Sequence, residues 1–116
     1  MSPRETTAMS VFEYHVLLAL ASGPLYGYAI KDAVESESAG TLMPRAGSMY
    51  RVIARLMTSG LVTETEPDDE TPPHPGHARK YYALTARGRT ALGTEARRLK
   101  RTAAVAEKRL GIAQSR

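Results

Sequence analysis

Residues 45–60 read RAGSMYRVIARLMTSG, and this stretch decides the fold of the chain. The spacing of its apolar residues predicts a helix with one buried face, formed by Met49, Val52, Ile53 and Leu56. Ser48 has the side chain of a helix N-cap, and Gly60 suits the left-handed position that ends a helix. The stretch is therefore predicted to be one helix with a marked start and end.

The opposite face of this helix carries cations and hydroxyls but no acid. It comprises Ser48, Arg51, Arg55 and Thr58, with Tyr50 beside them and Arg45 just before the helix. A helix with one face for a core and a basic face for a polyanion is what DNA recognition requires. An ordinary solvent-exposed helix face could have the same composition. The neighbouring segments must therefore decide between a DNA-recognition helix and a simple solvated face.

Composition narrows the class of protein. With 116 residues, of which 42% are hydrophobic, the chain has room for one domain with a modest core. Sixteen basic and twelve acidic residues give a net charge of +4, which is compatible with nucleic acid. The absence of cysteine excludes disulfides, thiolate zinc sites and cysteine nucleophiles. The longest apolar run is too short to span a bilayer and no signal-peptide pattern is present, so we expect a cytoplasmic protein without membrane contact.

Two helices are expected before the decisive stretch. Ser10 and Glu13 have the spacing of a capping box, which predicts a helix from there to about Ser22, before Gly23-Pro24. This helix is apolar on two faces, so we expect it to contact its own domain on one and a second subunit on the other.

A second helix is predicted from Leu25 to about Ser38, with a buried stripe of Tyr26, Ile30, Ala33 and Val34. Gly27 inside it predicts the close approach of another backbone. A turn over residues 39–44 then leads into the decisive stretch, which completes a helix-turn-helix arrangement.

The periodicity changes after Gly60. Residues 61–66 and 79–84 have the composition of strands, and residues 67–78 between them are rich in proline and acids. The three segments predict a β-hairpin wing. Strand geometry places Tyr81 and Tyr82 on opposite faces, so we expect one in the core and the other partly exposed.

Thr85 is the predicted cap of a final helix from Ala86 to about Leu110. Its apolar residues alternate at spacings of four and three, which is typical of a helix–helix seam: Leu92, Ala96, Leu99, Ala103, Ala106 and Leu110. Three leucines and three alanines make a weak seam for an isolated pair of helices. We therefore expect a dimer interface built from this helix and the first helix together.

Four motifs in this order resemble the PadR family of transcriptional regulators: GPLYGY at 23–28, GSMY at 47–50, GLV at 60–62 and RKYYALTARG at 79–88. The resemblance covers residues 8–92. It implies a winged-helix homodimer that binds pseudopalindromic operator DNA, usually as a repressor, and is released by a small ligand. The chain departs from the family pattern at Ala46, where proline is frequent. It also departs in its acidic wing tip, since acids close to phosphates would oppose binding.

The resemblance and the charge pattern together nominate the site residues. For DNA they are Arg45, Ser48, Tyr50, Arg51 and Arg55 of the recognition helix, with Arg79 and Lys80 at the base of the wing. The resemblance also implies a small aromatic effector between subunits, where the first and last helices meet. The residues expected to line that ligand and dimer interface are Phe12, Val16, Leu92, Ala96, Leu99 and Ala103.

We therefore expect a mainly α-helical fold with a small β-hairpin. A winged helix-turn-helix DNA-binding domain is expected over residues 1–85, with residues 1–7 as a flexible arm, and a dimerisation helix and tail over residues 86–116. No enzyme is expected, because no Ser/His/Asp grouping is present. No cofactor or metal site is expected either, since His74 and His77 lie in a proline-rich loop. A winged-helix module that binds protein rather than DNA is the alternative.

Overall fold

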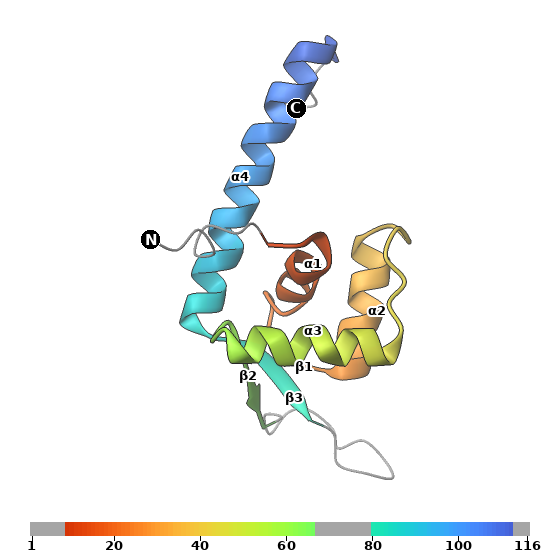
Figure 1. Ribbon diagram of the computed structural model, residues 1–116, viewed down its shortest axis with the longest axis vertical. Helices are drawn as coiled ribbons and strands as arrows, with labels where there is room; N and C mark the ends of the chain where they lie inside the picture. Colours follow the sequence, from red (N-terminus) through yellow and green to blue (C-terminus); the bar gives the residue numbers. More distant parts are fainter. Residues whose placement is uncertain (1–8, 67–79, 113–116) are drawn as a thin grey trace.

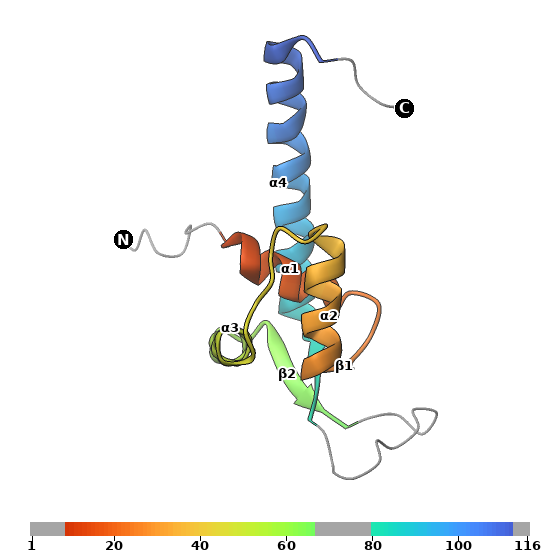
Figure 2. The same cartoon turned by 90° about the vertical axis from the view of Figure 1, so that its right-hand side faces the viewer.

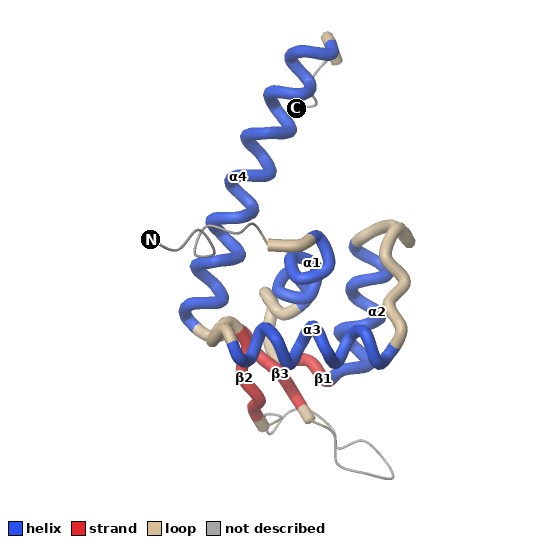
Figure 3. Tube along the Cα trace, in the orientation of Figure 1, coloured by secondary structure: helices blue, strands red, loops and turns tan. Residues whose placement is uncertain are grey.

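The computed structural model describes residues 9–66 and 80–112. Its elements are α1 (Val11–Ala19), β1 (Leu25–Tyr26), α2 (Gly27–Glu37), α3 (Ala46–Thr58), β2 (Val62–Thr65), β3 (Tyr81–Leu84) and α4 (Ala86–Leu110). The expected arm (1–7), wing tip (67–78), Arg79 and the tail after residue 112 lie outside the described residues. Mainly helical with a small antiparallel sheet, the architecture confirms the expected fold class (Figures 1 and 3).

The core lies where α1, α2 and α3 meet (Figure 1). Its fully buried side chains come from all three helices and include Val16, Leu17, Ile30, Val34, Met49 and Ile53. On α3 the four buried residues are Met49, Val52, Ile53 and Leu56, so the predicted stripe is confirmed. Gly60 has a φ of +81°, and Leu61 N donates to Leu56 O, as expected where a glycine ends a helix.

Three strands, not two, make the sheet. They lie in the order β1-β3-β2, with both pairs antiparallel. The β2–β3 hairpin was predicted, whereas Leu25 and Tyr26 were wrongly assigned to a helix. They pair instead with Tyr82 and Tyr81, and α2 begins at Gly27. The two-residue strand depends on a partner more than fifty residues away, so local periodicity could not reveal it.

The partner strand also explains the burial of the tyrosines. Tyr81 and Tyr82 are both buried, so the expectation that one is partly exposed is wrong. Tyr82 joins the hydrophobic core, while Tyr81 meets the ring of Tyr26 edge-on, with 5.7 Å between ring centroids. Because β1 pairs with β3, the side chain of Tyr26 covers Tyr81, which a two-stranded hairpin would leave open.

Two helix boundaries differ from their prediction. α1 ends at Ala19 rather than near Ser22, because the chain turns from Leu20 onward before it enters β1. α3 starts at Ala46 with Arg45 as its N-cap, so Ser48 lies in the first turn and is not the cap. The loop before α3 is held by Ser38, whose Oγ accepts from Leu42 N at 3.0 Å, and the backbone is helical directly after Arg45.

The N-terminal caps of α1 and α4 are the residues that the sequence predicted. Ser10 and Glu13 form the predicted capping box on α1. Thr85 Oγ1 accepts from Gly88 N at 2.9 Å and donates to Gly60 O at 2.6 Å. It therefore starts α4 and ties it to the end of α3. α4 packs on α1 through its first turns, with Leu92 in the core, and its later turns project away from the domain (Figure 1).

Among the described residues, no helix is both long and apolar enough to cross a membrane.

Candidate DNA-binding surface

The outer face of α3 and the β2–β3 hairpin lie at the end of the molecule opposite to the projecting α4 (Figures 1 and 2). Arg45, Tyr50, Arg51 and Arg55 are exposed on α3 or at its start, and Ser48 is half-buried. Helical geometry places Gly47, Arg51, Ala54 and Thr58 opposite the buried stripe, with Ser48 and Arg55 on one flank and Tyr50 on the other. The predicted α3 residues thus form one surface, with small side chains beside Arg51.

The side chain of Arg51 runs back along α3 toward the start of the helix. Its Nη2 donates to Ser48 Oγ at 3.4 Å, and its guanidinium runs back toward Gly47. A Cβ on Gly47 would lie 3.9 Å from Arg51 Nη1, an ordinary contact. Ser48 therefore supports an arginine instead of capping the helix.

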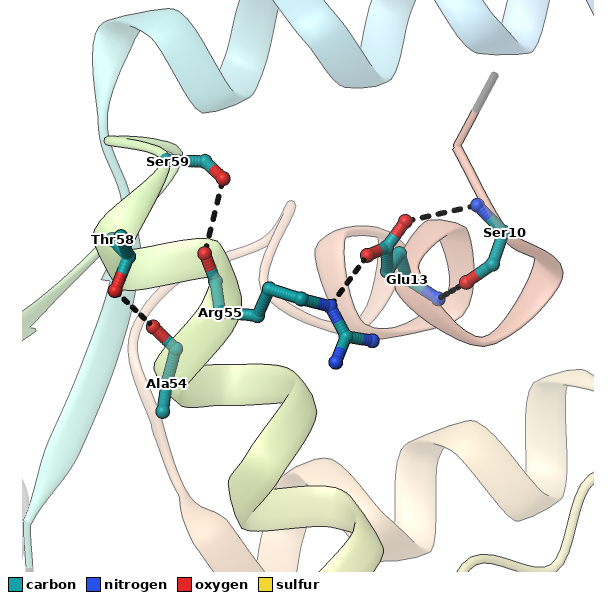
Figure 4. Close-up of polar contacts among 6 residues, drawn as sticks. All are labelled: Ser10, Glu13, Ala54, Arg55, Thr58 and Ser59. Atoms are coloured by element: carbon teal, nitrogen blue, oxygen red, sulfur yellow. Dashed lines mark hydrogen bonds and ion pairs between the residues drawn. The ribbon is translucent and has the colours of Figure 1, made fainter. Parts of the chain in front are cut away.

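Arg55 has a partner that the sequence pattern did not reveal. Its Nε donates to Glu13 Oε2 at 3.2 Å, although the two residues are 42 positions apart (Figure 4). The outer face of α3 carries no acid of its own, but α1 supplies one. The Ser10–Glu13 spacing marked Glu13 only as a capping residue, and no local signal pointed to its long-range contact.

Lys80 at the base of the wing is likewise paired. Its Nζ lies 3.4 Å from Glu64 Oε2 across the β2–β3 hairpin, and both side chains are well exposed. An exposed pair of this kind contributes only about 0–1 kcal/mol to stability. Lys80 is therefore free to exchange Glu64 for a phosphate. Arg79, the other predicted wing cation, lies outside the described residues.

The side chain of Tyr50 packs against the start of α2. A Cβ on Gly27 would overlap the Tyr50 hydroxyl and lie 2.9 Å from its ring carbon Cε1. The close approach predicted at Gly27 is thus real, but the neighbour is a side chain and not a backbone. Burial raises the pKa of nearby Tyr82, and Tyr50 and Glu64 add to that rise.

Two of the cations on this surface have no acidic partner among the described residues, and both lie in or just before the N-terminal half of α3. Among the described residues, Arg45 and Arg51 have no acidic partner within ion-pair distance, whereas Arg55 and Lys80 do. Arg45 also lines a pocket of about 310 Å³ beside the start of α3, together with Phe12, Thr41, Leu42, Met43, Pro44 and Ser48. The surface therefore concentrates positive charge near the N-terminal half of α3.

The residues predicted for the ligand and dimer interface are not all brought together. Val16 is fully buried in the core of the domain, and Phe12 lines the pocket beside α3. Leu92 is buried against α1, Ala96 is half-buried, and Leu99 and Ala103 are exposed. In the single chain the later seam of α4 is thus an uncovered apolar strip that runs from Leu99 and Ala103 to Leu110.

Two ionisable groups lie near the α1–α4 region. Glu95 on α4 is buried and accepts from Arg98 Nε at 2.9 Å, and this hydrogen bond holds the pKa of the Glu95 carboxyl below its usual range. His15 on α1 is half-buried, and its Nδ1 has no hydrogen-bond partner among the described residues. No group of three or more potential metal ligands occurs within the described part of the chain.

Comparisons with known proteins agree with this geometry. Residues 16–94 match the model of the transcriptional regulator PadR-like family. An uncharacterised 37.1 kDa protein in transposon TN4556 of Streptomyces fradiae is 41% identical over 86 residues, which are 74% of this chain. The chain covers only 22% of the length of that protein.

Solved structures give the same fold. A PadR family transcription regulator from Clostridium difficile superposes with a TM-score of 0.70 at 22% identity, over 87% of this chain and 99% of that one. Bacillus subtilis PadR in complex with operator DNA superposes with a TM-score of 0.59 at 25% identity, over 73% of this chain and 46% of that one.

Proposed function

Because this chain belongs to the PadR-like family of transcriptional regulators, we propose that it binds operator DNA as a homodimer through α3 and the β2–β3 hairpin. We further propose that it acts as a repressor, which a small hydrophobic or aromatic ligand releases. The observation that carries the proposal is the α3 surface, where Arg51 lies opposite the buried stripe beside small residues. Among the described residues, neither Arg51 nor Arg45 at the start of the helix has an acidic partner. Membership of a family of regulators also agrees with the expectation that the chain is not an enzyme.

The shape of α3 supports entry into a DNA groove. An α-helix fits the major groove, and close approach needs small side chains next to those that reach the bases. Gly47 and Ala54, both small, flank Arg51 on the outer face. Lys80 on the hairpin supports a second contact, with the DNA backbone, because its pairing with Glu64 is weak.

The uncovered seam supports the dimer. A strip of exposed apolar side chains along a projecting helix is what an interface leaves when one protomer is considered alone. Two copies of α4 packed along this seam would bury Leu99 and Leu110. In this arrangement the two α3 helices would lie on one side of the assembly. Two linked recognition helices match an operator with two symmetric half-sites.

The effector is proposed for the same interface. Ala96 and Leu99 leave space for a flat apolar molecule between protomers, and Val16 is excluded from the lining by its burial. Such a ligand releases DNA only if it binds the unbound spacing of the two domains more tightly than the operator-bound spacing.

Arg51→Ala tests the α3 assignment. We expect a mobility shift of DNA from upstream of the gene with the wild-type protein, and a weaker shift with the variant. A lost phosphate contact would reduce the salt slope by about one unit, while a lost base contact would cost about 1–3 kcal/mol. Thr94→Ala, an exposed change on α4 away from both α3 and the seam, is the control. A folded Arg51→Ala protein that binds like wild type would refute the assigned face, and no shift with wild type would favour the protein-binding alternative.

A further inference from the structure

Glu13 has two hydrogen-bonding tasks, one on each carboxylate oxygen. Oε1 accepts from Ser10 N at 2.9 Å, while Ser10 Oγ accepts from Glu13 N at 3.0 Å, which closes the capping box of α1. Oε2 accepts from Arg55 Nε at 3.2 Å (Figure 4). The Glu13 side chain is 20% exposed and that of Arg55 57%. The carboxylate is therefore fixed by its own helix and offers its second oxygen to α3.

This contact leaves the outer edge of Arg55 available. A guanidinium has five N–H donors, of which one is on Nε. Among the described residues, neither Nη atom of Arg55 has a hydrogen-bond partner. Both Nη atoms extend beyond the bonded Nε in Figure 4. Two parallel N–H donors at the end of an arginine are the group that meets O6 and N7 of guanine in the major groove.

The Glu13–Arg55 contact weakens the general attraction of Arg55 for DNA but fixes the orientation of its side chain. A carboxylate next to Arg55 offsets the positive charge that would draw any DNA phosphate, whatever its sequence. At the same time it restricts the side chain before DNA arrives, which lowers the ordering cost of a contact that needs one geometry. An anchored arginine is thus poorly suited to non-specific binding and well suited to a directional contact.

We infer that Glu13 is a positioning residue, which holds Arg55 so that its Nη edge distinguishes operator from non-operator DNA. This inference rests on the proposed function. It assigns the first helix a part in DNA reading that its packing role alone would not give it.

Glu13→Gln tests the inference, because glutamine keeps the hydrogen bonds of a capping box but removes the charge. We expect affinity for non-operator DNA to stay the same or rise, and affinity for the operator to fall. The ratio of the two affinities should drop about fivefold or more, the lower limit of what one base contact discriminates. Arg55→Lys should produce the same drop, since lysine keeps the charge but has neither Nε nor a paired edge.

Ser10→Ala is the matched control. It removes the hydroxyl that accepts from Glu13 N but leaves Ser10 N, Glu13 and Arg55 in place. We expect a lower melting temperature with an unchanged operator to non-operator ratio. In the double variant Glu13→Gln/Arg55→Lys, the drop should be no larger than in either single variant, because both act on one contact.

The contrary outcomes are distinct. An unchanged ratio in folded Glu13→Gln and Arg55→Lys, while wild type still discriminates, would make the bridge merely structural and overturn the inference. If Glu13→Gln fails to fold, Glu13→Asp takes its place, because aspartate keeps a carboxylate for the cap of α1 but is too short to hold Arg55 Nε. A wild-type protein without any operator preference would instead overturn the proposed function on which the inference rests.

Discussion

Gly88→Ala should weaken the junction between α3 and α4. Gly88 lies in the first turn of α4, and a Cβ there would overlap the Leu61 carbonyl oxygen and lie 2.9 Å from the carbonyl carbon. Both neighbours are backbone atoms, so they cannot rotate away. The same carbonyl accepts from Thr85 N at 3.1 Å, and Thr85 Oγ1 donates to Gly60 O. The added methyl must push α4 away from the residues that hold its start.

The expected loss follows from these contacts. Overpacking a fixed site costs about 1–3 kcal/mol, and weakening the two hydrogen bonds to residues 60 and 61 costs about 0.5–1.5 kcal/mol each. Alanine returns about 1 kcal/mol through its higher helix propensity. The free energy of unfolding should therefore fall by about 1–5 kcal/mol, a large part of the roughly 5–15 kcal/mol available to a domain.

Gly93→Ala is the matched control, one helix turn and a half further along α4. A Cβ there would lie 3.6 Å from Arg97 Nη1, the end of a flexible side chain. This substitution should raise stability slightly, through helix propensity alone. Urea unfolding followed by circular dichroism gives both values. Equal stability of Gly88→Ala and Gly93→Ala would refute the close approach of α4 to Leu61.

Three further predictions concern assembly, effector and pH. Leu99→Asp places a charge in the seam of α4, so sedimentation should show monomers or unfolded protein, and operator binding should fall. An intact dimer of this variant would rule out the seam. Ala96→Trp should fill the proposed effector space and weaken release of DNA by an aromatic ligand, with operator affinity nearly unchanged; a full ligand response would place the effector elsewhere. Since Arg98 lowers the pKa of Glu95 in the folded state, their pair stabilises the fold above the ordinary glutamate pKa and loses this contribution as the pH falls through the lowered value. Glu95→Gln should thus flatten the acid limb of a plot of stability against pH, and an unchanged acid limb would contradict the assignment.

Local patterns predicted the elements that depend on local physics. The stripe of α3, the glycine at its end, the capping box of α1 and the start of α4 at Thr85 all follow from spacing or from contacts within four residues. The seam beyond Leu92 was also visible as a pattern, and its exposure in one protomer is what the proposed interface requires.

Features that depend on distant partners were missed. β1 exists only because Leu25 and Tyr26 pair with β3, and the burial of Tyr81 follows from that pairing. Glu13 reaches Arg55 from another helix, so a surface that lacks acids in sequence has one in space. Ser48 had the right side chain for a cap, but the backbone becomes helical earlier, after Arg45. A single sequence carries no signal for contacts of this range.

We propose above that the two α3 helices of a dimer bind one operator. Hydroxyl-radical footprinting on the DNA fragment that the protein binds most tightly tests it directly. Two symmetric protected segments are expected, with centres one helical turn, about 34–36 Å, or a whole number of turns apart. A single protected segment, or uniform weak protection without sequence preference, would contradict it.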